Sequence, residues 1–171
     1  MSFLSRLDAR DREAFLRWVA DDASAFALAF WRTITHVGGA TFTIAASLAA
    51  VLFAQGALHD AGVDALVALT VTHLAAQLVK RTVVRPRPEG LSFEALIEIP
   101  DRFSFPSGHA IAASSLAFVY ATHFPALAPA LLVIATLVAV SRVRLGVHYP
   151  GDVIAGQAIA LLGAALVIAF R

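Results

Sequence analysis

The feature that most constrains this chain is a series of five apolar stretches, separated by short polar breaks, that fills most of it from residue 40 onward. A helix needs about 20 apolar residues to cross a bilayer, and backbone groups inside lipid must be satisfied within a helix or a closed barrel. The hydrophobic fraction of 59% is too high for an ordinary water-soluble domain. The sequence therefore predicts an all-α, polytopic membrane helix bundle with five spans, at 40–57, 63–79, 110–124, 126–140 and 153–170.

The breaks and the helix contacts follow from the same pattern. A polar turn is expected at 59–62, between the first two spans, and the third and fourth spans are short enough to need flanking residues. Small residues recur on the last span and would let helices pack closely: Ala155, Gly156, Ala160, Gly163 and Ala164.

The chain before residue 40 gives a weaker membrane signal. Residues 2–22 alternate charged and apolar side chains at roughly helical spacing, which predicts an amphipathic helix, either lying on the membrane surface or docked on the bundle. Residues 24–36 are apolar but too short to cross alone, carry Arg32 and end at Gly38 and Gly39. They form a possible sixth element that continues the surface helix or enters the membrane at a slant. We expect one domain over 1–171, with an interfacial segment at 1–38 and a helical core at 40–171.

A short motif at 106–109 precedes the third apolar stretch. Pro106 can end a preceding helix, Ser107 is a good N-cap, and Gly108 lets a ligand approach the backbone closely. Unpaired amides and the positive end of the helix dipole make such a terminus a natural anion site. His109, in the first turn, can donate a proton to the group that carries the anion. Taken alone, the motif is equally well explained as a capped helix with an incidental histidine.

Two further polar clusters lie where apolar stretches end. The second stretch runs into four cations, including Lys80 and Arg87, which either orient the protein by the positive-inside rule or bind a multiply charged anion. The fourth runs into Arg142 and then His148 and Asp152, four residues apart. A carboxylate at that distance can hold one imidazole nitrogen and leave the other as a nucleophile, although an isolated pair of this kind can also be an ordinary surface contact.

Alternating spans bring these clusters together. The end of the second span, the start of the third, the end of the fourth and the start of the fifth all lie on one membrane face. The opposite turns hold only His59, Asp60 and His123. This agreement favours one site at one face, made of Lys80, Arg87, Ser107, His109, Arg142, His148 and Asp152.

These residues resemble the three-part signature of the type 2 phosphatidic acid phosphatase family, membrane lipid-phosphate phosphatases related to the vanadium-dependent haloperoxidases. In the first part, six residues separate Lys80 from Arg87-Pro88. The second part is Pro106-Ser107-Gly108-His109. In the third, five residues separate Ser141-Arg142 from His148, and three more separate His148 from Asp152. All three parts are complete and in order. The resemblance covers residues 80–152 and weakens before residue 40, since members often have six spans.

The resemblance implies a role for each of these residues. His148 would attack phosphorus and form a phosphohistidine, with Asp152 fixing its orientation. His109 would protonate the leaving alkoxide and then help to activate the water that releases phosphate. The non-bridging oxygens would be held by Lys80, Arg87, Ser107, Gly108 and Arg142. Phosphoryl transfer depends mainly on positioning and charge stabilisation, and no carboxylate cluster indicates a magnesium or zinc site, so we expect neither a metal nor a cofactor.

The implied function is metal-independent hydrolysis of a lipid phosphate monoester or diphosphate, with release of inorganic phosphate. A lipid phosphotransferase using the same site is the alternative. Phosphatidic acid, phosphatidylglycerol phosphate, polyprenyl diphosphates and polyprenyl-linked sugar phosphates all qualify as substrates. The expected partners are this lipid and the bilayer, and nothing in the sequence indicates a nucleic acid or an obligate protein partner.

The membrane face can be argued in two ways. Twelve of the 13 Lys and Arg residues lie before the first span or on the site side, so with five spans the positive-inside rule puts the site in the cytoplasm. The family resemblance, and a separate crossing by residues 24–36, would both turn the site outward. We expect an integral protein of the bacterial cytoplasmic membrane whose site opens to the extracytoplasmic face.

Overall fold

The computed structural model describes residues 3–19, 24–88, 95–97 and 101–171, and this part of the chain is all-helical, as predicted. The helices are α1 (Phe3–Trp18), α2 (Ala25–His36), α3 (Ala40–Phe53), α4 (Ala57–Val83), α5 (Gly108–His123), the short 3-10 helix η1 (Pro125–Leu127), α6 (Ala128–Arg144) and α7 (Pro150–Ala169).

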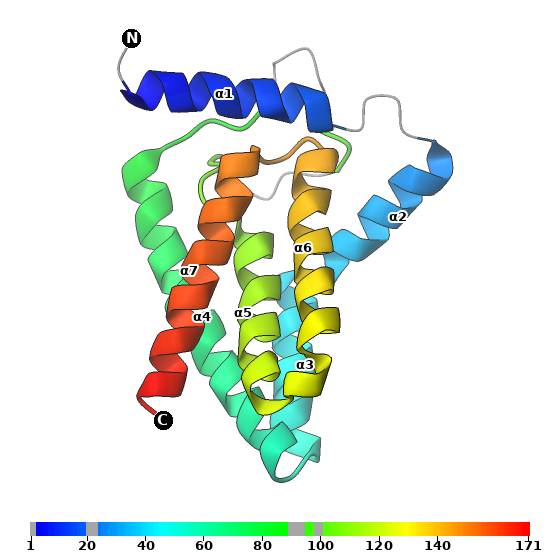
Figure 1. Cartoon of the computed structure of the whole chain (residues 1–171), viewed down its shortest axis with the longest axis vertical. Coiled ribbons are helices and arrows are strands. Elements are labelled where there is room, and N and C mark those ends of the chain that lie inside the picture. Colours follow the sequence, from blue (N-terminus) through cyan, green and yellow to red (C-terminus); the bar gives the residue numbers. More distant parts are fainter. Residues whose placement is uncertain (1–2, 20–23, 89–94, 98–100) are drawn as a thin grey trace.

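Helices α3 to α7 form an elongated bundle, and α1 lies across one end of it (Figure 1). The direction of the chain alternates, so α4 and α6 end toward the same end of the bundle at which α5 and α7 begin, the end that α1 covers (Figure 1). The four helix ends that carry the predicted site residues therefore meet at one end of the bundle.

Three helical segments are long and apolar enough to cross a membrane: α4, η1 with α6 (Pro125–Arg144), and α7. Helices α2 and α3 meet the same criterion only together, as a pair bent by 48°. The bend lies at Gly38 and Gly39. Helix α5 has 16 residues and falls short of the criterion. An integral membrane protein is supported, whereas a count of five spans is not confirmed by the length and composition of the described helices.

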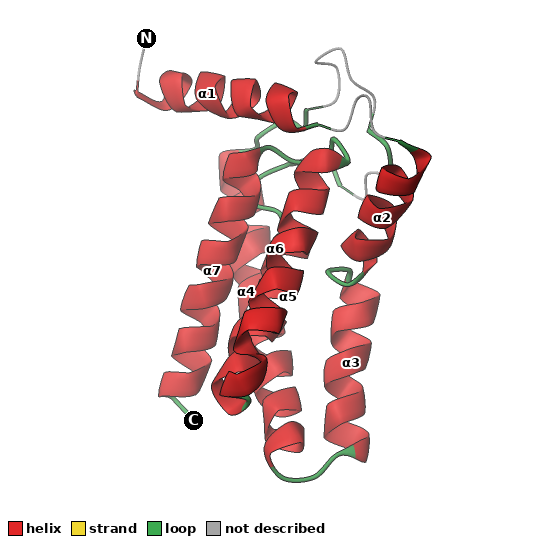
Figure 2. Ribbon diagram, turned by 45° about the vertical axis from the view of Figure 1, so that its right-hand side comes forward, coloured by secondary structure: helices red, strands yellow, loops and turns green. Residues whose placement is uncertain are grey.

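The bent pair also bears on the membrane face. Together α2 and α3 run once from the α1 end of the bundle to the opposite end (Figure 2). Helix α1 stays beside the site, where its Asp8 and Asp11 form ion pairs with Arg85. Counted as one span, the pair would not let residues 24–36 cross separately from residues 40–53. The membrane face to which the site opens stays a prediction.

The bundle has large apolar residues outside and small residues inside. Phe53, Leu78 and Leu162 are 85%, 67% and 66% exposed, as expected for side chains that face lipid. Buried residues between the helices are mainly alanines together with hydroxyl side chains, such as Thr72 and Ser115, whose oxygens lie 3.3 Å apart. A Cβ at Gly163 of α7 would collide with the Thr72 side chain of α4, so the predicted close packing of the last span is confirmed.

The polar turn predicted at 59–62 was misplaced. Helix α4 begins at Ala57, and the preceding turn uses Gly56 in the left-handed region at φ 60°. Asp60 and Asp64 lie within the helix and accept from Arg171 at 3.1 and 2.9 Å. Acidic groups are favourable near a helix N-terminus, which explains why polar letters here do not interrupt the helix.

Candidate active site

The chain leaves α4 through an abrupt turn. Val84, the C-cap, has φ 47°, in the left-handed region that ends the helix. The chain then runs antiparallel to the segment before α5, with a bridge between Pro86 and Phe103 and a bond of 2.9 Å from the Ser104 amide to the Arg85 carbonyl. The first signature segment is thereby joined to the second.

Ser107 caps α5 as predicted, because its hydroxyl accepts from the Ala110 amide at 3.4 Å. Its own amide donates to the Asp152 carbonyl at 3.0 Å, which joins the second signature segment to the third. Gly156 of α7 permits this approach, since a Cβ there would come within 2.9 Å of the Ser107 carbonyl. Gly108 is exposed, and a Cβ there would meet no atom within 4 Å, so packing within the described chain does not require glycine at this position.

The turn between α6 and α7 sets the His148–Asp152 pair. Gly146 takes φ 78°, and the amides of residues 147 and 148 then both donate to the Arg142 carbonyl at 3.2 Å. Asp152 caps α7 from inside, with Oδ2 accepting from the Tyr149 amide at 2.8 Å. Turn and cap place imidazole and carboxylate side by side in the buried end of the bundle.

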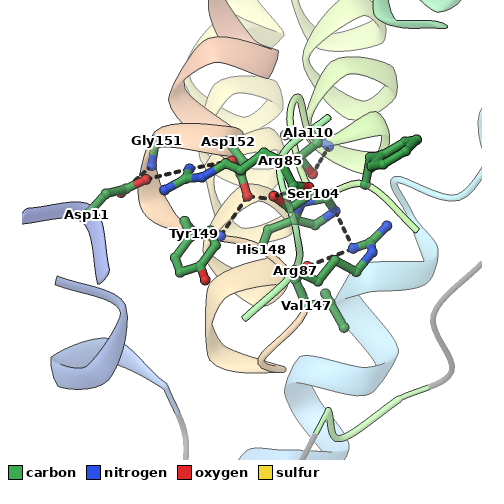
Figure 3. A network of polar contacts seen from close by, with 12 residues as sticks. Asp11, Arg85, Arg87, Ser104, Ala110, Val147, His148, Tyr149, Gly151 and Asp152 are labelled. Atoms are coloured by element: carbon green, nitrogen blue, oxygen red, sulfur yellow. Dashed lines mark hydrogen bonds and ion pairs between the residues drawn. The ribbon is translucent and has the colours of Figure 1, made fainter. Parts of the chain in front are cut away.

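His148 is 2% exposed and lies between a carboxylate and a guanidinium (Figure 3). Its Nδ1 is 3.5 Å from Asp152 Oδ2, and its Nε2 is 3.3 Å from Arg87 Nη1. The first distance is long for a hydrogen bond. Because a guanidinium can only donate, Nε2 carries the lone pair and Nδ1 carries the proton. Burial, reinforced by Arg142 and Arg87 and opposed by Asp152, lowers the pKa of His148 to about 4, so the imidazole is a neutral base at pH 7.

Two of the predicted phosphate-binding cations share one carboxylate. Asp101 accepts from Lys80 Nζ at 2.8 Å and from Arg87 Nη2 at 2.7 Å. Partial burial would raise the pKa of Asp101, but these two cations outweigh it and hold that pKa below its usual range. Arg87 also donates to the Val147 carbonyl at 2.6 Å, which fixes its guanidinium beside His148.

Arg142 is 1% exposed, and a hydrogen bond to α2, the first helix of the bent pair, holds its side chain in place. Its Nη1 donates to Thr35 Oγ1 of α2 at 2.7 Å, whereas its Nε has no partner in the described part of the chain. His109 is half-buried and lies within the electrostatic influence of the Arg142 cation. The break at Gly38 brings the α2–α3 backbone against His109, since a Cβ at Gly38 would lie 2.9 Å from the His109 carbonyl.

All eight predicted site residues thus lie at the same end of the bundle, and the direct contacts join His148 to Asp152 and Arg87. Across the described residues, no group of three or more His, Cys, Asp or Glu side chains could hold a metal ion. The arrangement offers a neutral imidazole lone pair surrounded by cations, which suits attack on a bound phosphate. The catalytic and binding roles of these residues remain predictions.

Sequence reasoning missed four groups at this end. Arg85, one of the four cations that follow the second apolar stretch, donates to Asp152 Oδ1 at 2.7 Å. Thr35, Asp101 and the aspartates of α1 were not singled out, because an ordinary polar residue at a helix end carries no signal of its partner. Residues 89–101 mix apolar and acidic side chains, a pattern that suggests a short interfacial helix, but this segment lies largely outside the described residues.

Comparisons with known proteins show the family to which this chain belongs. The family model of the PAP2 superfamily matches residues 61–171. The chain is 37% identical over 125 residues to decaprenylphosphoryl-5-phosphoribose phosphatase of Mycolicibacterium smegmatis, covering 73% of this chain and 68% of that one. It is 36% identical over 110 residues to lipid A 1-phosphatase of Rhizobium johnstonii, where the match spans 60% of this chain and only 45% of the relative.

A solved structure has the same fold. The crystal structure of a transmembrane PAP2-type phosphatidylglycerolphosphate phosphatase from Bacillus subtilis superposes with a TM-score of 0.78 at 27% identity, over 96% of this chain and 86% of that one. The chain belongs to the PAP2 superfamily, and its relatives in this comparison are lipid phosphatases.

Proposed function

We propose that this protein hydrolyses a lipid phosphate monoester through a phosphohistidine formed on His148. The observation that carries the proposal is the buried His148 imidazole, with its Nε2 3.3 Å from Arg87 Nη1 and its Nδ1 beside Asp152. A phosphate bound by Arg87 would lie next to the lone pair that attacks it. Family membership supports the reaction class, since the relatives are named as phosphatases of lipid phosphates.

The reaction has two balanced steps. In the first, His148 Nε2 forms a bond to phosphorus as the bond to the lipid oxygen breaks, and His109 gives its proton to the leaving alkoxide. In the second, water attacks phosphorus, its proton passes to His109, the P–N bond breaks, and inorganic phosphate leaves. Asp152 stabilises the positive charge that His148 carries between the steps. Lys80, Arg87, Arg142 and the Ser107–Gly108 turn would hold the non-bridging oxygens.

We also propose that the reaction needs no metal. Magnesium and zinc sites are built from carboxylates, imidazoles or thiolates free to ligate. Here the nearest carboxylates, Asp101 and Asp152, are already paired with Lys80, Arg87 and Arg85. The remaining site charges are cations, which would repel a divalent ion from the phosphate position.

The substrate class follows from the position of the site. A phosphate site at the end of an apolar bundle selects molecules whose phosphate is attached to a lipid tail. Because the Mycolicibacterium relative acts on a phosphosugar carried by decaprenyl phosphate, a polyprenyl-linked sugar phosphate is the first substrate to test. Phosphatidic acid and phosphatidylglycerol phosphate are the next, and we propose that residues 1–171 act on them as a single domain.

Phosphate release from this panel in detergent micelles tests the proposal. Wild-type protein should release free phosphate from at least one of these lipids. Loss of the nucleophile in His148→Ala should lower the rate by at least about a thousandfold. His59→Ala removes an exposed imidazole at the opposite end and should leave the rate unchanged. Phosphate release that survives His148→Ala would refute the mechanism, and transfer between lipids without free phosphate would favour a phosphotransferase.

A further inference from the structure

Arg85 connects the predicted catalytic pair to the N-terminal helix. One nitrogen, Nη1, donates to Asp152 Oδ1 and to Asp11 Oδ2, both at 2.7 Å, and Nη2 donates to Asp8 Oδ1 at 2.8 Å (Figure 3 shows the first two). The Asp152 carboxylate is completely buried, so its bond to Arg85 is shielded from water. Such charge-assisted bonds are stronger than bonds between neutral groups.

The two oxygens of Asp152 have different partners. Oδ2 accepts from the Tyr149 amide and is the oxygen nearest His148 Nδ1, at 2.8 and 3.5 Å respectively. Oδ1, the other oxygen, accepts from Arg85. Rotation of the carboxylate away from His148 would break both bonds, so Arg85 helps to fix which oxygen the imidazole meets.

Helix α1 in turn fixes Arg85. Besides its bond to Arg85, Asp11 accepts from the Gly151 amide at 2.7 Å, at the first turn of α7. The Arg85 guanidinium lies 4.0 Å from the centroid of the Tyr149 ring, and that ring meets Phe15 of α1 edge-on at 5.5 Å. Phe15 is fully buried. Helix α1 is therefore docked on the site by charge and by packing.

The charge balance keeps this arrangement intact. Burial alone would lower the pKa of Arg85, but Asp152, Asp11 and Asp8 outweigh it and raise that pKa above its ordinary value. The guanidinium thus stays charged across the pH range in which the protein is folded. Its three carboxylate partners come from α7 and α1 and from no other described helix.

We infer that Arg85 is a positioning residue, which aims the Asp152 carboxylate at His148, and that Asp8 and Asp11 make α1 part of the catalytic apparatus. The inference rests on the proposed function, because it acts through Asp152 and His148. In the described part of the chain, the Arg85 side chain has no hydrogen bond or ion pair with His148 or with a predicted phosphate-binding residue. It should therefore affect the rate of the chemical step and leave substrate binding unchanged.

A double-variant cycle tests this. Arg85→Gln should lower kcat about 10- to 100-fold, the usual effect of misaligning a catalytic group, with KM unchanged. In the Asp152→Asn background the same substitution should cost less than about threefold, because the group that Arg85 aims is already lost. Arg85→Lys, which keeps the charge, should recover part of kcat. The folded fraction of each variant, measured by circular dichroism in detergent, normalises each rate.

Arg81→Gln is the matched control, since Arg81 is an exposed cation at the same end of α4, and it should keep the wild-type kcat. Equal losses for Arg85→Gln in both backgrounds would show that Arg85 acts only on the fold and would overturn the inference. So would an unchanged kcat in Arg85→Gln. If His148→Ala and Asp152→Asn were themselves fully active, the proposed function would fail instead, which separates the two.

The role of α1 has its own test. Asp11→Asn keeps the size of the side chain but turns one acceptor into a donor, so it can serve Arg85 or Gly151 but not both. It should lower kcat about 3- to 10-fold and add nothing in the Arg85→Gln background. Arg10→Gln, on the exposed side of α1, is the control and should have no effect. An additive loss in the double variant would show that α1 does not act through Arg85.

Discussion

Replacing Thr35 by valine should uncouple α2 from the site. Thr35 is 3% exposed, and its hydroxyl accepts from Arg142 Nη1 at 2.7 Å. Valine has nearly the same shape but cannot accept a hydrogen bond. Since Arg142 Nε already lacks a partner in the described chain, the substitution would leave a second donor of the same buried cation unsatisfied.

The expected cost is that of a hydrogen bond to a charged group, about 1.5 to 3 kcal/mol. For a chain of this size, that corresponds to a drop of about 3 to 12 °C in the midpoint of thermal unfolding. Because Arg142 would no longer be held toward the phosphate, kcat/KM should also fall about 10- to 100-fold. Thermal unfolding in detergent, followed by circular dichroism, and phosphate release measure the two effects.

Thr43→Val is the matched control. Thr43 is equally buried, at 1% exposure, but its hydroxyl donates to the carbonyl of Gly39, which also accepts from the Thr43 amide at 3.0 Å. That carbonyl stays satisfied without the hydroxyl, so the midpoint should move by less than about 2 °C. Equal shifts for both variants would refute the reasoning, because they would show that any buried threonine on these two helices behaves alike.

Three further predictions concern charge, metal and topology. In protein with labelled histidine and no substrate, NMR should show His148 titrating near pH 4. Because its pKa in the unfolded chain is about 6.5, the contribution of His148 to the free energy of unfolding should fall by about 3 kcal/mol as pH drops from 6.5 to 4. A titration midpoint above 6.5 would contradict the burial argument. Phosphate release should persist in excess chelator, and full loss restored by a divalent ion would refute metal independence. The chain has no Cys, so single cysteines at Arg10 and Val84 should be labelled from one side of the membrane and one at Gly56 from the other; labelling of the first two from opposite sides would exclude the fold.

The arrangement of the site could be predicted because its residues stand at helix ends. A proline, a cap or a cation next to an apolar stretch fixes which end of a span it occupies, and the alternation of spans does the rest. Ser107 illustrates this, since the residues around it predict the N-cap that the structure shows at the start of α5.

Contacts between distant segments could not be predicted in this way. Arg85 and Arg87 are both arginines before proline, yet Arg87 meets His148 and Arg85 meets Asp152 and α1, and no local pattern distinguishes the two. Thr35 lies in a segment too short to read as a span, and only the bend between α2 and α3 brings it to Arg142. The predicted start of the second helix was wrong because a polar residue was taken as a turn. Asp60 lies inside α4, and its charge is paired with Arg171 far along the chain.

Trapping the covalent intermediate tests the central claim most directly. Wild-type protein mixed with a lipid phosphate labelled with ³²P and quenched within milliseconds should carry protein-bound label that is stable in alkali and lost in acid, as expected for phosphohistidine. His59→Ala should trap the same amount and His148→Ala none. Label that persists on His148→Ala, or phosphate release by wild type without any trapped label, would contradict the account.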